Sequence, residues 1–206
     1  MTPLELEKPT EISRAKRLKA HTGETHDRLD RSIMAGRPFE SRERYGLFLK
    51  VQQQFHRDID ALYSNVALDT LLPELARRRR LGLVEQDLTD LGVPKPVPEA
   101  PPAFGADPDI PTATGWLYVA EGSNLGAAFL LKEAEKLGLS ANFGARHLAA
   151  GPEGRALNWK TFTAALDALD LTKEEEARVT LGAEAAFRRV RSLVINVFVE
   201  EPTPTG

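Results

Sequence analysis

Apolar side chains recur along much of this chain at intervals of three and four residues, the spacing of one α-helical face. A first helix is predicted over residues 11–35, ended by Gly-Arg-Pro at 36–38. Its inward stripe consists of Leu18, Thr22, Leu29 and Ile33. Ser41 is a good N-cap for a second helix, whose inward positions are Tyr45, Phe48, Val51, Phe55, Ile59 and Leu62 or Tyr63. A third segment, 68–91, is broken or restarted at Pro73.

The helical pattern stops over residues 93–111, which hold seven of the fourteen prolines. Such a run favours extended backbone and cannot continue a helix. An interdomain linker is one interpretation, but each half of the chain would then be a thin helical fragment. A long surface connection within one domain is the better interpretation.

Helical spacing resumes over residues 115–138 and again after a glycine-rich loop. Asn158 is a candidate cap for a helix that reaches residue 169. Thr172-Lys-Glu-Glu175 has the form of a capping box and opens a last helix that extends to Val199. The short run VINVF at 194–198 continues the same apolar face, so it is predicted to be helical.

No alternating strand pattern competes over any length of the chain. The sequence therefore predicts an all-α protein of six or seven helices, folded as one compact domain over residues 1–206. Residues 1–10 and 200–206 are expected to be flexible termini.

Composition narrows the function classes. A formal net charge of −3 argues against a dedicated nucleic-acid binder, and the basic run Arg77–Arg80 fits a solvated helix face. The absence of cysteine excludes disulfides, thiolate metal sites and cysteine nucleophiles. With no apolar signal segment and no window of eighteen apolar residues, we expect a soluble cytoplasmic protein without a membrane partner.

Three glycines interrupt the predicted helix GWLYVAEGSNLGAAFLLKEAEKLG at positions 115, 122 and 126. A helix turns about 100° per residue, so all three lie within roughly 40° of one another on one face. Each interior glycine costs about 1 kcal/mol relative to alanine. Two explanations stay open: close packing against another helix, or close approach of a ligand to bare backbone. Ser123 adds a hydroxyl that can bond back to a carbonyl and bend the helix.

Only four histidines are present, at positions 21, 26, 56 and 147. His56 is expected to form a surface pair with Asp60, and His147 to fold or cap its glycine-rich loop. His26 falls on the inward stripe, where a lone histidine is usually a hydrogen-bonded core residue. Metal ligation is the alternative, because Asp30, one turn later, is placed to accept the second ring N–H.

Other site chemistries lack their sequence patterns. The chain contains no Glu-x-x-His pair of a di-iron bundle, no phosphate-binding Walker loop, no HExxH and no GxSxG. The segment 122–126 loosely suggests a phosphate loop, but no strand precedes it and no Lys-Ser/Thr follows it.

Four segments together resemble the heme oxygenases, especially the bacterial iron-acquisition branch that produces biliverdin. They are LKAHTGETHDRLD at 18–30, KVQQQFH at 50–56, GWLYVAEGSNLGAAFL at 115–130 and GARHLA at 144–149. The similarity covers nearly the whole chain. It implies a heme held between a proximal helix and a kinked distal helix. Heme would be both substrate and cofactor, cleaved by O2 and electrons from an external reductase or ferredoxin to biliverdin, iron and CO.

The resemblance also implies roles for individual residues. His26 takes the place of the proximal iron ligand, and Gly122 and Gly126 take the places of the distal glycines, with Ser123 beside them at the heme. Gln52 and Arg80 would hold distal water.

Heme propionates require cations or hydroxyls, and Lys19 and Tyr118 match the positions that the family uses for them. Because both are present, the resemblance implies cleavage at the α-meso carbon. Arg188, Arg189 and Arg191 match relatives too poorly for any role to be transferred. The family suggests a monomer. The alternatives are a heme carrier or sensor on the same fold, and a relative that has lost heme.

Overall fold

The computed structural model describes residues 13–72 and 74–200, and over these residues the chain is helical without a named strand. Within the described residues, the only β-type contacts are isolated bridges from Ser140. The predicted all-α class is confirmed. The seven α-helices are α1 (Arg14–Ala35), α2 (Arg42–Ile59), α3 (Val66–Leu71), α4 (Leu81–Asp90), α5 (Ile110–Glu135), α6 (Arg155–Asp167) and α7 (Lys173–Glu200). Three short 3-10 helices are η1 (Asp60–Ser64), η2 (Leu75–Arg78) and η3 (Arg146–Leu148).

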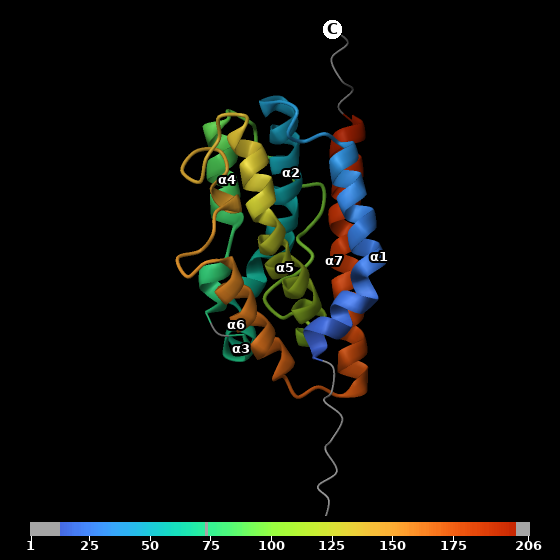
Figure 1. Ribbon diagram of the computed structural model, residues 1–206. Helices are drawn as coiled ribbons and strands as arrows, with labels where there is room; N and C mark the ends of the chain where they lie inside the picture. Colours follow the sequence, from blue (N-terminus) through green and yellow to red (C-terminus); the bar gives the residue numbers. More distant parts are fainter. Residues whose placement is uncertain (1–12, 73, 201–206) are drawn as a thin grey trace, which may run out of the picture.

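The helices form two groups joined by α5. Figure 1 shows α1 and α7 side by side along one edge of the molecule, with α2, α4 and the C-terminal half of α5 forming the opposite upper part. The helix α6 lies below these, near α3. The core consists of two hydrophobic clusters: a large one shared by α1, α2, α5, α6 and α7, and a smaller one around Tyr45, Phe48 and Leu88. Both α2 and α5 contribute to each cluster. No described helix is long and apolar enough to span a bilayer.

Local sequence signals explain most helix starts. Ser41 accepts a hydrogen bond from the Arg44 N–H at 3.2 Å, as expected for an N-cap. Thr172 and Glu175 form the predicted capping box, with reciprocal side-chain-to-backbone bonds of 2.8 and 3.2 Å. Each of these caps satisfies N–H groups that the helix itself leaves unpaired.

Two predicted boundaries are wrong. The helix α6 begins at Arg155 after Gly154, so Asn158 lies inside the helix and does not cap it. Gly154 has φ of 82°, a conformation that glycine adopts without a steric penalty. The proline-rich connection ends earlier than expected, because Pro111 stands in the first turn of α5, where its missing N–H costs nothing. Pro73 lies outside the described residues, as do residues 1–10 and 201–206 of the predicted flexible termini, whereas Glu200 is the last residue of α7.

The glycines on one face of α5 have two different kinds of surroundings. A Cβ on Gly115 would lie 2.1 Å from the carbonyl oxygen of Val179, and one on Gly182 would lie 2.3 Å from that of Thr112. The backbones of α5 and α7 therefore touch at a crossing that only glycine permits. By contrast, a Cβ on Gly126 would meet nothing within 4 Å. The two helices thus touch near the start of α5 and separate along it (Figure 1).

His56 is not the surface residue that the sequence suggested. It is 6% exposed within α2, its ring lies 5.7 Å from that of Phe55, and its Nδ1 has no hydrogen-bond partner. Burial, with smaller contributions from His147 and Arg80, lowers the pKa of His56 to about 3. The expected pair with Asp60 does not form, because Asp60 instead accepts from Arg79.

The crossing predicts that Gly115→Ala lowers stability although alanine is the better helix former. The added methyl group must displace backbone, which typically costs about 1–3 kcal/mol and outweighs a propensity gain of up to about 1 kcal/mol. Chemical denaturation followed by circular dichroism measures the difference. Gly82→Ala is the matched control, since its Cβ would meet nothing within 4 Å. Equal or greater stability of Gly115→Ala would contradict the close crossing.

Burial of neutral His56 predicts a loss of stability in mild acid. Its folded pKa of about 3 lies below the ordinary 6.5, so the unfolded chain binds the extra proton and stability falls from pH 6.5 towards 3. The slope from one such group approaches about 1.4 kcal/mol per pH unit. Urea denaturation between pH 6.5 and 5 should show a shallower slope for His56→Leu than for the wild type. The His21→Leu variant, which changes an exposed histidine of α1, should keep the wild-type slope.

Candidate functional site

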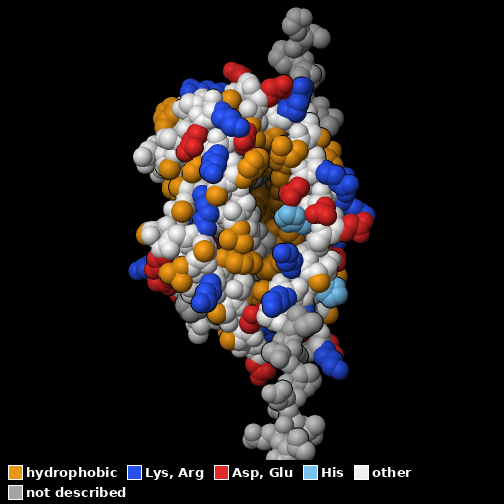
Figure 2. Space-filling model, viewed as in Figure 1, with side chains coloured by type: hydrophobic (Ala, Val, Ile, Leu, Met, Phe, Trp, Pro, Cys, Tyr) orange, Lys and Arg blue, Asp and Glu red, His pale blue; other side chains and the backbone are white. Residues whose placement is uncertain are grey.

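An open cleft lies where α5 has separated from the α1 and α7 pair. Figure 2 shows it as a hollow with mostly hydrophobic walls and a histidine at its margin. On α5, Phe129 is 55% exposed and lies seven residues beyond Gly122, on the same helix face. An exposed aromatic beside bare backbone is typical of a surface that receives an apolar ligand.

His26 stands on the α1 wall of this cleft. Its side chain is 54% exposed, so the expectation of a buried core histidine is wrong. The inward stripe of α1 continues at this position, but α5 is no longer close enough to cover it. The ring packs edge-on against Phe187 of α7 with centroids 5.7 Å apart. Its Nδ1 lies 3.3 Å from Oδ2 of Asp30, the predicted partner, which leaves Nε2 available to a ligand.

The glycines on α5 form the opposite wall. Gly126 is exposed and its missing side chain leaves open space, whereas a Cβ on Gly122 would only touch the Trp159 ring at 3.5 Å. Ser123 is exposed and donates to the Ala120 carbonyl at 2.7 Å, three residues earlier. The helix remains one continuous element, and its two halves lie at an angle to each other in Figure 1.

Tyr118 and Lys19 lie near one end of the cleft. The Tyr118 side chain is 7% exposed, its ring lies 5.7 Å from that of Trp159, and its hydroxyl lies near the Thr22 side chain of α1. Burial raises the pKa of Tyr118, so its hydroxyl keeps its proton. Lys19 precedes Thr22 by one turn and is exposed. The hydroxyl and the ammonium group therefore come from two different helices, α5 and α1.

Gln52 and Arg80 occupy different surroundings. Gln52 is half-buried on α2, and its side chain makes no hydrogen bond with the described residues. Arg80, at the start of α4, donates to the carbonyls of His147 and Ala149 at 3.4 and 3.1 Å. Burial lowers the pKa of Arg80, while Glu121 opposes this shift.

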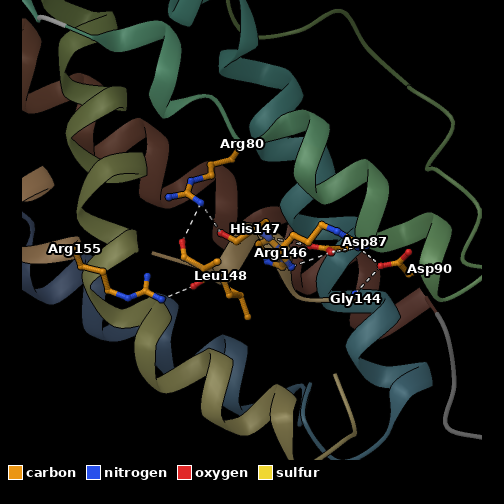
Figure 3. A network of polar contacts seen from close by, with 9 residues as sticks. Arg80, Asp87, Asp90, Gly144, Arg146, His147, Leu148 and Arg155 are labelled. Carbon is orange, nitrogen blue, oxygen red and sulfur yellow. Dashed lines mark hydrogen bonds and ion pairs between the residues drawn. The ribbon is translucent and has the colours of Figure 1, made fainter. Parts of the chain in front are cut away.

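The η3 loop is held by a buried carboxylate (Figure 3). Asp87, fully buried on α4, accepts from the backbone N–H groups of Arg146 and His147 at 2.9 and 3.0 Å. Its Oδ2 also lies 2.8 Å from His147 Nδ1. His147 therefore folds its loop, as expected. Burial lowers its pKa, although Asp87 acts in the opposite direction, so its imidazole is neutral at pH 7.

A second buried polar group was missed by sequence reasoning. Glu121, immediately before Gly122, is 5% exposed and accepts from Arg78 at 2.9 Å and from the Tyr63 hydroxyl at 3.4 Å. Burial raises the pKa of Glu121, and Arg78 opposes the shift. A lone carboxylate within the apolar run GWLYVAEG was the available signal, because such a position must be paired when it is buried. The same helix thus carries open backbone on one side and an ion pair on another.

Comparison with known proteins gives one family. A family model described as heme oxygenase matches residues 103–196. The Pseudomonas aeruginosa protein named heme oxygenase PigA is 45% identical over 186 residues, which cover 90% of this chain and 93% of the relative.

Solved structures agree with this result. A crystal structure of NO- and CO-bound heme oxygenase from Neisseria meningitidis superposes with a TM-score of 0.86 at 42% identity, covering 95% of this chain and 96% of that one. A heme oxygenase from Leptospira interrogans, 18% identical, shares the fold with a TM-score of 0.73 over 90% of this chain and all of the other. Because a heme oxygenase that is 45% identical matches 90% of this chain, the chain belongs to the heme oxygenase family.

Proposed function

We propose that this protein is an enzyme that uses O2 and external electrons to cleave heme to biliverdin, iron and CO. One observation carries the proposal: a half-exposed histidine stands on one wall of an apolar cleft, and helix backbone without side chains forms the other. A flat, largely apolar ligand with a metal at its centre matches both walls. The family membership gives the reaction class.

The residues present suit heme. The His26 imidazole would ligate the iron through Nε2, with Asp30 fixing the orientation of the ring. When bound, heme supplies both the iron that activates O2 and the carbon framework that is oxidised. The protein must exclude bulk water and keep space beside the iron, and the open side of Gly126 meets the second requirement.

Proton supply falls to residues around the distal wall. No acidic or histidine side chain need touch the substrate if the backbone near Gly122 and ordered water deliver protons. We assign Gln52 and Arg80 to holding that water. Arg80 supports this role, since its Nε and Nη2 have no acceptor among the described residues while Nη1 fixes it to the η3 loop.

Lys19 and Tyr118 are proposed to hold the propionates. The exposed ammonium of Lys19 on α1 and the protonated hydroxyl of Tyr118 on α5 form a fitting pair of partners for carboxylates. This arrangement supports cleavage at the α-meso carbon. Electrons are proposed to come from an external ferredoxin or reductase, because side chains do not supply the reducing equivalents. The family resemblance further supports a monomer. The absence of cysteine permits any compartment and fits a reducing cytoplasm most simply.

Turnover of the heme complex tests the activity. With a reductant and O2, the heme spectrum should be replaced by that of biliverdin, and chromatography should identify the α isomer. A complex that binds heme tightly but never opens the ring would instead be a carrier or sensor. His26→Ala should remove the axial-ligand signature from the ferric spectrum, and exogenous imidazole should restore it. An unchanged spectrum would contradict the ligand assignment.

The open side of Gly126 predicts that Gly126→Leu blocks the site without destabilising the fold. Leucine improves helix propensity by about 0.5–1 kcal/mol, while its side chain enters the cleft. Heme or O2 affinity should fall at least tenfold, measured by titration of the Soret band and of the ferrous complex. Gly82→Leu on α4 is the matched control and should bind normally. Full activity of Gly126→Leu would show that the bare face has no ligand-binding role.

A further inference from the structure

A cavity of about 160 Å³ lies apart from the cleft, where η2, the start of α4, α5 and the start of α6 meet. No residue of α1 lines it, and of the residues assigned above to the heme site only Arg80 does. On α5 its wall is made by Glu121 and Asn124, which flank Gly122 and Ser123. The cavity therefore lies against the helix that forms the distal wall.

The charges around this cavity do not cancel. Arg77 pairs with Glu74, and Arg78 pairs with Glu121. Arg80 and Arg155 also line the cavity, but neither forms an ion pair with a described residue. The remaining lining carboxylate, Glu153, makes no ion pair either. The two guanidinium groups thus leave one excess positive charge after Glu153 is counted.

The two arginines lie close together. Figure 3 shows both side chains reaching the same loop, Arg80 from the start of α4 and Arg155 from the start of α6. Arg155 donates to the carbonyls of Asn124, at 2.8 Å, and Leu148. Burial lowers the pKa of Arg155, and repulsion by Arg80 adds to the shift. Two like charges held together beside a cavity are stabilised when an anion binds between them.

Unused donors face this space. Arg80 bonds to carbonyls through Nη1 alone, so the N–H groups on its Nε and Nη2 have no acceptor among the described residues. The Nε of Arg155 is likewise without one. None of these nitrogens is a buried, unsatisfied atom, so each is reached by solvent. The start of α6 adds backbone N–H groups, since Gly154 provides no side-chain cap.

We propose that this cavity binds a small oxyanion of the phosphate type, either free phosphate or the phosphate group of a monoester, between Arg80 and Arg155. Guanidinium groups present paired N–H donors that match such oxygens. The cavity is large enough to admit a phosphate group. The phosphate would use the Arg80 donors that we also assign to distal water, so the site shares one residue with the proposed heme site. Phosphate binding itself requires no heme, and it can therefore be tested on the heme-free protein.

Titration of the heme-free full-length protein tests this site. Calorimetry with inorganic phosphate and with glycerol 3-phosphate should show saturable binding, and the melting temperature should rise with either ligand. Chloride at matched ionic strength should have no such effect. Tighter binding of the ester would identify a phosphate monoester as the ligand, whereas equal or weaker binding would identify free phosphate. No saturable binding of either probe overturns the proposal.

Variants locate the binding site. Arg155→Gln should weaken phosphate affinity at least tenfold, whereas Arg28→Gln, which changes an exposed arginine paired with Glu24 on α1, should leave it unchanged. Because Arg155→Gln also loses bonds to two carbonyls, Glu153→Gln provides an independent test. Removing that carboxylate should tighten binding two- to fivefold. Unchanged affinity in both cavity variants would place any bound phosphate elsewhere and overturn the proposal.

Discussion

The architecture depends on the contact between two backbones where α5 crosses α7. Gly115 and Gly182 face each other's helices there, and neither position has space for a Cβ. Because side chains are absent, the helices meet at a distance that other residues would prevent. This contact anchors the start of α5 in the large hydrophobic cluster, while the rest of the helix leaves α7 and exposes one face. The cleft is therefore the consequence of a close contact several turns away.

The far side of α5 combines apolar and charged burial. Glu121 is compensated by Arg78 and Tyr63, and Asp87 is compensated by N–H groups of the η3 loop. A buried carboxylate is tolerated only with such partners. The first set of contacts ties α5 to η1 and η2, and the second ties α4 to the η3 loop. The distal wall is thus supported from behind by polar bonds, while its front carries no side chains at Gly122 and Gly126.

Helix order, caps and the all-α class could be predicted because they depend on local signals: apolar periodicity, Ser41, and the Thr172 capping box. The pairing of His26 with Asp30 could also be predicted from the sequence, since the two residues lie one turn apart on a single helix. The burial of His56 and the pairing of Glu121 could not be predicted, because they depend on which helices cover those faces. The three glycines illustrate the limit: spacing placed them together, but only tertiary structure separates the crossing at Gly115 from the open wall at Gly126.

Because α5 and α7 touch at this crossing, the angle between the two helices sets the position of the rest of α5. Gly126 lies eleven residues, or about 16 Å of helix, beyond Gly115. A tilt of α5 by about 4° about the crossing moves the backbone at Gly126 by about 1 Å, a large change for a gap that must fit a planar ring. Near the crossing the Tyr118 hydroxyl of α5 lies beside the Thr22 side chain of α1, so the two helices are close to each other at that end. The width of the cleft at Gly126 therefore depends on the crossing angle of α5 and α7, about three turns away.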